Sequence, residues 1–466
     1  MARPLYLTPH ALLPLLMGRG PVSARDLAEA LRVNRSSVVR ALERFQPGEL
    51  LTVGARRSTR YLLRRPILAE GNRWPLYLIE ETGLAKHWGT LESVYPQRWR
   101  MTWEENRPAW ADHFCDRDGL WEGFPFFLQD IRPQGFVGRA IARRFSAALG
   151  VPADPAAWSD DHTLVYLCRE GDDGPGALVV GDAALQRAQT QAVFPSSGRI
   201  TSSADRLSRY PVLARDAALT LPGSSAGGEQ PKFLTNIRSE DDTLHPVLVK
   251  FSPPFDQPGG RRWADLLACE AHALDVLAEQ GLAVPASAVC DAGDRRFLEV
   301  PRFDRNGAAG RRSVVSLGAI HPASPGASSR TAWIEAATKL HESGLIDDAV
   351  VNTVQRLHAF GALIGNSDMH AGNLAFWLTD SVPFRLAPAY DMLPMLWAPG
   401  VQGEVPARAF TPAPPLPSQR GAWQQAAAWA DTFWQRVAAD SRISPDFAPV
   451  VDAARHALQK LRAHAG

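Results

Sequence analysis

Residues 365–376, GNSDMHAGNLAF, place one aspartate, one histidine and two asparagines within eight residues, directly before an apolar run. Short polar side chains of this kind favour turns, so ordinary loop chemistry is one explanation for the stretch. A functional site is the other, since its groups must converge on one point without filling the space around it. The stretch constrains the fold because one loop has to present all these groups together.

Chain length, apolar runs and cysteine content limit the kinds of protein that this sequence can form. A chain of 466 residues is too long for one ordinary core, so two to four domains are expected. No run of 18 apolar residues occurs, which predicts no transmembrane helix and no membrane partner. Pro14 interrupts the apolar amino-terminal stretch, which we interpret as a helix of the fold rather than a signal peptide. The four cysteines form no CxxC pair, so neither a disulfide framework nor a zinc site is expected, and we expect a cytoplasmic protein.

Positive charge is concentrated at the amino terminus. Residues 1–66 hold twelve arginines, no lysine and four acidic residues, whereas the net charge of the whole chain is only +1. Ser23 is a candidate N-cap for a first helix, and Asn34 or Ser36 starts a second one. A hairpin with the basic tip GARRSTR comes next. This order is typical of a winged helix, whose second helix enters the major groove of DNA.

We therefore predict a winged helix-turn-helix domain over residues 1–68, which binds duplex DNA through residues 1–66. The alternative is a small helical interaction domain with a solvated charged face. The residues expected to contact DNA are Arg35 and Arg40 on the second helix, with Arg56, Arg57 and Arg60 on the hairpin.

The remainder of the chain divides by composition and pattern. Residues 69–210 are mixed in character and carry no chemical motif, and we expect them to form a subdomain that packs on the C-terminal half of the chain. Residues 211–320 have the pattern of a strand-rich lobe with one amphipathic helix that ends at Gly281. Residues 321–466 have mainly helical periodicity, interrupted by the polar loop described above and by a proline-rich surface segment.

Several polar elements succeed one another along the strand-rich lobe. The stretch SSAGGEQPKF, residues 224–233, is glycine-rich, so its backbone amides could approach phosphate groups closely, although an ordinary turn is the simpler interpretation. Lys250 lies in the apolar strand HPVLVKF, where a buried ammonium needs a partner. A phosphate or a helix carboxylate such as Glu270 would serve. A lysine whose charged end reaches solvent from the strand end is the alternative.

The loop itself has the spacing D-x-x-x-x-N, formed by Asp368 and Asn373. In kinase catalytic loops such an aspartate accepts the proton of the attacking hydroxyl, and the asparagine holds a magnesium ion. Asp391 lies eighteen residues after Asn373, just past a strand-like segment, in a position suited to a second magnesium ligand. Each element is ordinary alone, but their order along the chain favours a phosphoryl-transfer site.

Residues from about 75 to 460 resemble the HipA family of bacterial serine/threonine kinases, on the motifs GGEQPKF, VLVKF, VPRFDR, GNSDMHAGNLAF and LAPAYDMLP. With a winged helix at the amino terminus, the chain is similar to the YjjJ-like branch of these toxins in particular. The resemblance implies an α+β, two-lobed protein-kinase-like fold, with ATP and Mg²⁺ as cofactors.

The resemblance also implies roles for individual residues. Asp368 is expected to be the catalytic base, and Asn373 and Asp391 the magnesium ligands. Autophosphorylation is expected at Ser225 or the adjacent Ser224. The residues expected to bind ATP are Gly227, Gly228, Glu229, Gln230, Pro231, Lys232, Lys250, Pro301, Arg302, Phe303, His370, Asn373, Tyr390 and Asp391.

Two features depart from the pattern of the family. Many members carry a lysine directly before the catalytic-loop asparagine, where this chain has Gly372, and His370 could partly replace that charge. The second departure is the fused DNA-binding domain, because HipA toxins usually rely on a separate DNA-binding antitoxin. An antitoxin therefore remains a possible partner.

The sequence favours an ATP-dependent serine/threonine protein kinase that phosphorylates a protein target and itself. A transcriptional regulator whose kinase-like fold senses nucleotide, with little or no transfer activity, is the alternative from another class. A small-molecule kinase on the same fold is a third. Gly372 and the basic amino terminus favour the regulator, whereas the complete set of Asp368, Asn373 and Asp391 opposes it.

Overall fold

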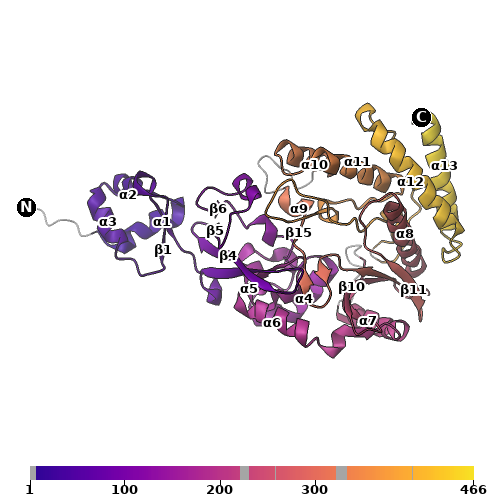
Figure 1. Cartoon of the computed structure of the whole chain (residues 1–466), viewed down its shortest axis with the longest axis horizontal. Helices are drawn as coiled ribbons and strands as arrows, with labels where there is room; N and C mark the ends of the chain where they lie inside the picture. The colour runs from indigo at the N-terminus through magenta and orange to yellow at the C-terminus, as the bar shows by residue number, and fades with distance from the viewer. Residues whose placement is uncertain (1–6, 221–229, 258, 322–332, 401, 466) are drawn as a thin grey trace, which may run out of the picture.

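The computed structural model describes residues 7–220, 230–257, 259–321, 333–400 and 402–465. Figure 1 shows an elongated molecule with a small helical unit at one end and the C-terminal helices at the other. Two five-stranded sheets lie between these ends. Within the described ranges, no helix is long and apolar enough to cross a membrane.

The amino-terminal unit has the predicted order of two helices, a turn and a hairpin. Its helices are η1 (Pro9–Leu12), α1 (Leu13–Arg19), α2 (Ala24–Leu31) and α3 (Arg35–Leu42), and its strands are β1 (Leu50–Val53) and β2 (Arg60–Leu63). Ser23 caps α2 in a capping box with Asp26, as the sequence predicts, and Asn34 precedes α3. Leu16, Leu27 and Val38 lie in a small core of this unit.

The hairpin of this unit is attached to the next sheet by its strands. Leu51, Val53 and Leu62 form an apolar cluster with Val94 and Leu120. The backbone N–H of Gly54 donates to Asp118 Oδ1 at 3.2 Å. The amino-terminal unit is therefore packed against the middle of the chain rather than joined to it by a free linker.

The middle of the chain is an antiparallel sheet with the strand order β6-β5-β4-β3-β7. Its strands are β3 (Arg73–Ile79), β4 (Ala85–Val94), β5 (Arg98–Trp103), β6 (Leu120–Trp121) and β7 (Leu178–Val180). The helices that separate or succeed these strands are α4 (Gly135–Leu149), α5 (Asp160–Glu170) and α6 (Asp182–Val193). Trp74, Leu76 and Leu91 belong to the main core of the molecule.

The second sheet has the order β11-β12-β10-β9-β8. Its strands are β8 (Ile200–Ser202), β9 (Lys232–Arg238), β10 (Leu244–Phe251), β11 (Ala288–Ala292) and β12 (Arg295–Pro301), with helices α7 (Arg206–Thr220) and α8 (Gly260–Glu279). Since β8 pairs with β9, this sheet starts before residue 211, and the boundary expected at 210/211 falls inside α7. The division into domains otherwise stays a prediction.

The last part is mainly helical, as its periodicity predicts. Its helices are α9 (Leu317–Ile320), α10 (Trp333–Glu342), α11 (Asp348–Leu363), α12 (Arg420–Ala439) and α13 (Ala448–Ala465). Its short strands are β13 (Arg305–Asn306), β14 (Gly310–Arg311), β15 (Val314–Ser316) and β16 (Ala375–Trp377). A single core continues from the middle sheet into these helices and includes Leu91, Trp110, Leu340, Phe360 and Trp434.

Candidate active site

A cavity of about 2410 Å³ opens where the second sheet, the middle part and the helical part meet. The sequence-predicted residues come to this cavity from β9, β10, the end of β12, the polar loop and the segment after it. Those that line it are Gln230, Lys232, Lys250, Pro301, Arg302, Phe303, Asp368, His370, Asn373, Tyr390 and Asp391.

The remaining predicted residues of the site are not among those that line this cavity in the described ranges. Pro231 is not part of the cavity wall, and its carbonyl oxygen accepts from the backbone N–H of Phe251 at 3.1 Å. Ser224, Ser225, Gly227, Gly228 and Glu229 lie outside the described residues.

Lys250 is the buried centre of the cavity's charged groups. It projects from β10 with 4% of its side chain exposed, and its Nζ donates to Glu270 Oε1 at 2.5 Å and to Asp391. Glu270 lies on α8, as the sequence suggested, and only 1% of its side chain is exposed. Burial would lower the pKa of Lys250, but the two carboxylates more than offset it, so its pKa is raised and the ammonium stays charged.

The two carboxylates differ in what Lys250 does to them. Burial favours the neutral form of Asp391, but Lys250, together with Lys232 and His370, outweighs it and lowers the pKa of Asp391 to about 2. Burial prevails at Glu270, whose pKa is raised although Lys250 acts against the shift. Asp391 is therefore ionised at neutral pH, as a metal ligand has to be.

The polar loop begins where α11 ends. Gly365 has a φ of +79°, and a Cβ there would meet the ring of Trp397 at 2.5 Å, so only glycine fits at this turn. The buried side chain of Asn366 accepts from the backbone N–H of Asp368 at 3.0 Å and donates to the carbonyl of Asp391 at 3.2 Å. Sequence reasoning missed Asn366, although its place two residues before Asp368 was a signal for an Asx turn.

The second asparagine of the loop closes it from the other side. Asn373 is buried, and its Nδ2 donates to the carbonyl of Asp368 at 2.9 Å. Asp368 itself is exposed to the cavity. The D-x-x-x-x-N spacing thus has a structural reason. It lets the side chain of Asn373 reach across the turn and fix the backbone of Asp368.

His370 and Gly372 fit together. The ring Nδ1 of His370 accepts from the backbone N–H of Gly372 at 3.0 Å, so the proton of the neutral ring lies on Nε2. A Cβ at position 372 would meet Cε1 of His370 at 2.9 Å. A side chain at position 372 would force the histidine ring to shift, which gives a steric reason for this departure from the family pattern.

Aromatic rings line the end of the cavity near β12. The rings of Phe303 and Tyr390 lie 5.7 Å apart at 32°, and Trp377 meets Phe303 nearly at a right angle, at 5.9 Å. The Tyr390 hydroxyl donates to the carbonyl of Gly372 at 2.6 Å, which links this end to the polar loop.

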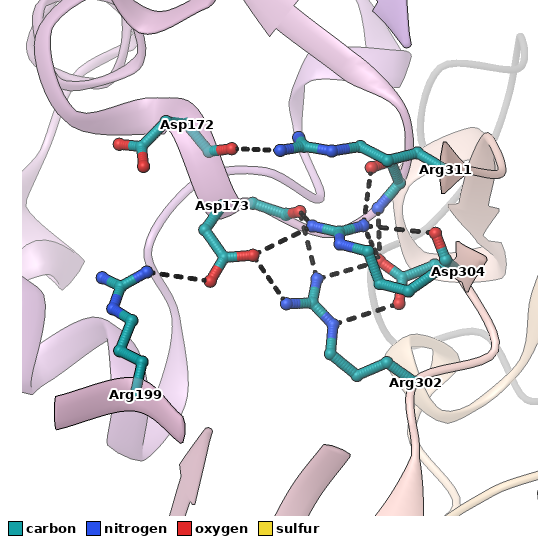
Figure 2. Close-up of polar contacts among 9 residues, drawn as sticks. Asp172, Asp173, Arg199, Arg302, Asp304 and Arg311 are labelled. Carbon is teal, nitrogen blue, oxygen red and sulfur yellow. Dashed lines mark hydrogen bonds and ion pairs between the residues drawn. The ribbon is translucent and has the colours of Figure 1, made fainter. Parts of the chain in front are cut away.

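Arg302 lines the cavity, but its charged end turns toward the protein. Its guanidinium points to Asp304 and Asp173, with 2.8 Å between Nη1 and Asp173 Oδ1 and 3.0 Å between Nη2 and Asp304 Oδ2 (Figure 2). Its Nη2 also donates to the carbonyl of Gly174 at 3.3 Å. The side chain is thus engaged by the protein itself.

The side-chain oxygens of Asn373 and Asp391 fit a magnesium ion whose other ligands would be phosphates and waters. Asn373 and Asp391 supply a carboxamide and a carboxylate, which are hard ligands of the kind Mg²⁺ takes, usually one or two together with phosphates and waters. The described ranges contain no group of three or more His, Cys, Asp or Glu side chains that could hold a metal. Asp391 has a φ of 53°, a left-handed conformation uncommon outside glycine and frequent at functional sites.

The five arginines predicted to contact DNA are exposed, and none forms an ion pair within the described part of the chain. Arg40 donates from Nε to the carbonyl of Ser36 in its own helix at 3.3 Å. The remaining four are Arg35 on α3, Arg56 and Arg57 in the hairpin turn, and Arg60 at the start of β2.

Comparison with known proteins agrees with this architecture. The HipA-like C-terminal domain matches residues 224–460, so the second sheet and the helical part form a HipA-like, two-lobed kinase-like fold, as predicted. The middle domain of YjjJ-like toxins matches residues 70–189. The chain is 36% identical to Toxin YjjJ of Escherichia coli (strain K12) over 452 residues, which are 96% of this chain and 95% of that protein. It belongs to the YjjJ-like toxins of the HipA family, which confirms the resemblance seen in the motifs.

Two solved structures are also similar. HipA of Shewanella oneidensis MR-1, solved with HipB and its operator DNA, matches with a TM-score of 0.48 and 14% identity, over 84% of this chain and 97% of that one. The proinflammatory kinase CtkA of Helicobacter pylori matches with a TM-score of 0.34 and 12% identity, over 48% of this chain and 94% of that one.

Proposed function

We propose that this protein is an ATP-dependent serine/threonine protein kinase that phosphorylates a protein target and itself. One observation carries the proposal. Lys250 and Asp391 lie 141 residues apart in the chain, yet they meet in the cavity that also holds Asp368 and Asn373. An ion pair, a candidate base and two oxygen ligands in one cavity are the parts that phosphoryl transfer needs.

The residues have distinct roles in this proposal. Asp368 accepts the proton of the attacking hydroxyl, and Asn366 and Asn373 hold its backbone in place. With ATP bound, Lys250 would keep its contact with Glu270 and could pair with the phosphates, and Asp391 and Asn373 would hold Mg²⁺. The metal would neutralise charge that develops on the phosphates. His370 would offer its Nε2 to the phosphates, and Phe303 and Tyr390 would contact the adenine.

Self-modification is proposed at Ser225 or Ser224. A phosphate there would add about −1.5 to −2 charge beside the bound nucleotide, so activity should fall after modification. The test is mass spectrometry of the purified chain incubated with ATP and Mg²⁺, with Asp368→Asn as the matched control. Phosphate on Ser224 or Ser225 of the protein without substitutions, and none on the Asp368→Asn variant, supports the proposal. No incorporation into the chain or into added proteins would contradict kinase activity.

DNA binding through residues 1–66 is the second part of the proposal. The five exposed arginines support it, because they form no ion pair in the described residues and lie on the predicted second helix and hairpin. A separate antitoxin is a further possible partner. If the chain binds DNA and ATP but transfers no phosphate, a transcriptional regulator that senses nucleotide becomes the better description.

A further inference from the structure

The segment 302–316, here called the connector, joins the second sheet to the helical part. It starts directly after β12 and ends directly before α9. Its first residues are tied to the middle part of the chain by ion pairs. Asp173, at the end of η7 (Gly171–Asp173), accepts from Arg302 Nη1 at 2.8 Å and from Arg305 Nη2 at 3.1 Å (Figure 2).

Asp304 completes this cluster from within the connector. It lies between the two arginines, with 3.0 Å to Arg302 and 2.6 Å to Arg305. The backbone N–H of Gly176, in the middle part, donates to Asp304 at 2.8 Å. At most 11% of the side chains of Arg302, Arg305 and Asp304 is exposed, so these charges depend on one another for solvation.

The centre and the far end of the connector are held by the same part of the chain. The backbone N–H of Arg311 donates to the carbonyl of Glu80 at 3.0 Å. Gly310 lies so close to Glu81 that a Cβ would be 2.2 Å from its carbonyl oxygen. At the end, Asp130 accepts from the Ser316 hydroxyl at 2.6 Å and from its backbone N–H.

Both ends of the connector touch the candidate active site. At the start, Pro301 and Phe303 line the cavity. At the end, the backbone N–H of Leu317 donates to the carbonyl of Leu374 at 2.8 Å, and a Cβ on Gly318 would lie 3.3 Å from the backbone of Ala371. The connector therefore sets how far the sheet that carries Lys250 lies from the loop that carries Asp368.

We infer that Asp173 is a positioning residue, through which the middle part of the chain holds the connector and thereby sets the nucleotide-binding geometry between the lobes. The inference rests on the proposed ATP-dependent function. Asp173 also lies on the wall of the cavity, and its positioning role runs through Arg302 and Arg305, whose donors it shares with Asp304.

The test compares Asp173→Asn with Asp161→Asn in the full chain. Asp161 is a matched control, because it pairs with Arg65 and its side chain is 34% exposed, against 37% for Asp173, but it lies away from the connector. We expect Asp173→Asn to raise the dissociation constant and the KM for ATP-Mg²⁺ about tenfold, with a smaller change in kcat. Asp161→Asn should stay within twofold, and Asp173→Glu should recover part of the affinity.

Hydrogen exchange provides a readout without nucleotide. Amides of residues 302–312 should exchange faster in Asp173→Asn than in the unmodified chain or in Asp161→Asn. Slow exchange of these amides together with unchanged ATP affinity would overturn the inference, even if the melting temperature falls. If the unmodified chain binds no ATP, the proposed function fails, and the exchange experiment still decides whether Asp173 holds the connector.

A second variant covers the case in which Asp173→Asn does not fold. Arg302→Lys keeps the positive charge, but a lysine cannot bridge Asp173 and Asp304 with a planar fork. We expect faster exchange over 302–312 and a threefold or larger loss of ATP affinity. If this variant folds and its amides over 302–312 exchange as slowly, and it binds ATP as tightly, as the unmodified chain, the inference is contradicted.

Discussion

Asp368 is positioned through its backbone by two buried asparagines. Asn366 accepts from its N–H and Asn373 donates to its carbonyl, so the turn on either side of the aspartate is fixed. A base that is held in this way loses little freedom when a substrate hydroxyl arrives. Asn366 therefore belongs with the site, although it touches no reacting atom.

Asn366→Ala should lower kcat roughly tenfold, because two hydrogen bonds of ~0.5–1.5 kcal/mol each are lost, one to the backbone of Asp368 and one to that of Asp391. The KM for ATP should change less. Steady-state phosphate incorporation measures both values. Asn352→Ala, an exposed asparagine on α11, is the control and should match the unmodified chain. An unchanged kcat in Asn366→Ala would show that Asn373 alone suffices.

Asp368→Asn should abolish phosphoryl transfer and leave the fold intact, because asparagine is nearly isosteric but cannot accept the proton. Asp391→Ala should instead weaken magnesium-dependent ATP binding, since it removes a metal ligand. Transfer assays and calorimetry with and without Mg²⁺ separate the two variants. Undiminished transfer by Asp368→Asn would exclude Asp368 as the base.

Lys250→Ala should reduce ATP affinity about ten- to a hundredfold, as expected for the loss of one or two charge-assisted contacts of ~1.5–3 kcal/mol. Calorimetry measures the affinity, and Lys339→Ala on the surface of α10 is the control. If Lys250→Ala binds ATP as tightly as the unmodified chain, the lysine serves only to neutralise Glu270 and Asp391.

At the scale of elements, the hairpin β1–β2 is held against the middle sheet while its turn stays exposed. Leu51, Val53 and Leu62 are buried against that sheet, whereas Arg56 and Arg57 are exposed. The basic turn is thus presented at a fixed place, which suits phosphate contacts. The apolar attachment also means that DNA binding is best tested on the full chain.

Five phosphate contacts would make log K fall with log salt by a slope of roughly −4 to −5, since each contact contributes about 0.9. Replacing Arg56 and Arg57 with alanine should flatten the slope by about two. Fluorescence anisotropy with duplex DNA at several salt concentrations measures it. Arg420→Ala with Lys460→Ala, a pair of exposed charges at the far end of the molecule, should leave the slope unchanged. Failure to bind any duplex at low salt would contradict DNA binding.

At the scale of the whole molecule, ion pairs join parts that belong to different family domains. The buried Asp304 and the partly exposed Asp173 both pair with Arg302 and Arg305, between the middle part and the connector (Figure 2). Burial would raise the pKa of Asp304, but Arg302 and Arg305 outweigh it and lower this pKa from 3.8 to about 2. The pKa of Asp173 is lowered by the same arginines, again against the effect of burial.

These shifts predict how stability depends on pH. Because the folded pKa of Asp304 lies below its unfolded value, its contribution is present above about pH 4 and is lost as pH falls toward 2. The shift corresponds to about 2 kcal/mol. The free energy of unfolding of Asp304→Asn should be lower than that of the unmodified chain at pH 7, with the difference shrinking below pH 4.

Denaturant melts at pH 7, 5, 4 and 3 would measure this difference. Asp431→Asn removes the exposed partner of Arg462 and should cost little at any of these pH values. A difference between Asp304→Asn and the unmodified chain that stays constant with pH would show that its charge contributes no stability.

Much of this protein was predictable from short stretches of sequence. The capping box at Ser23, the helical periodicity of the last part and the D-x-x-x-x-N spacing all lie within a few residues or turns of chain. Local spacing determines which groups one loop or helix presents, so Asp368 and Asn373 could be paired before any fold was known. Lys250 was added because it lies in an apolar strand and Asp391 because it follows a strand-like segment, and the family motifs agreed with both.

The tertiary structure alone decided the long-range partners. Residues 69–210 show no motif, yet their Asp173 and Asp130 hold the two ends of the connector. The guanidinium of Arg302 is held by Asp173 and Asp304, which the sequence did not indicate, and its expected contact with nucleotide stays a prediction. No local spacing encodes such contacts, because they form only when one continuous core brings the middle sheet, the connector and the helical part together.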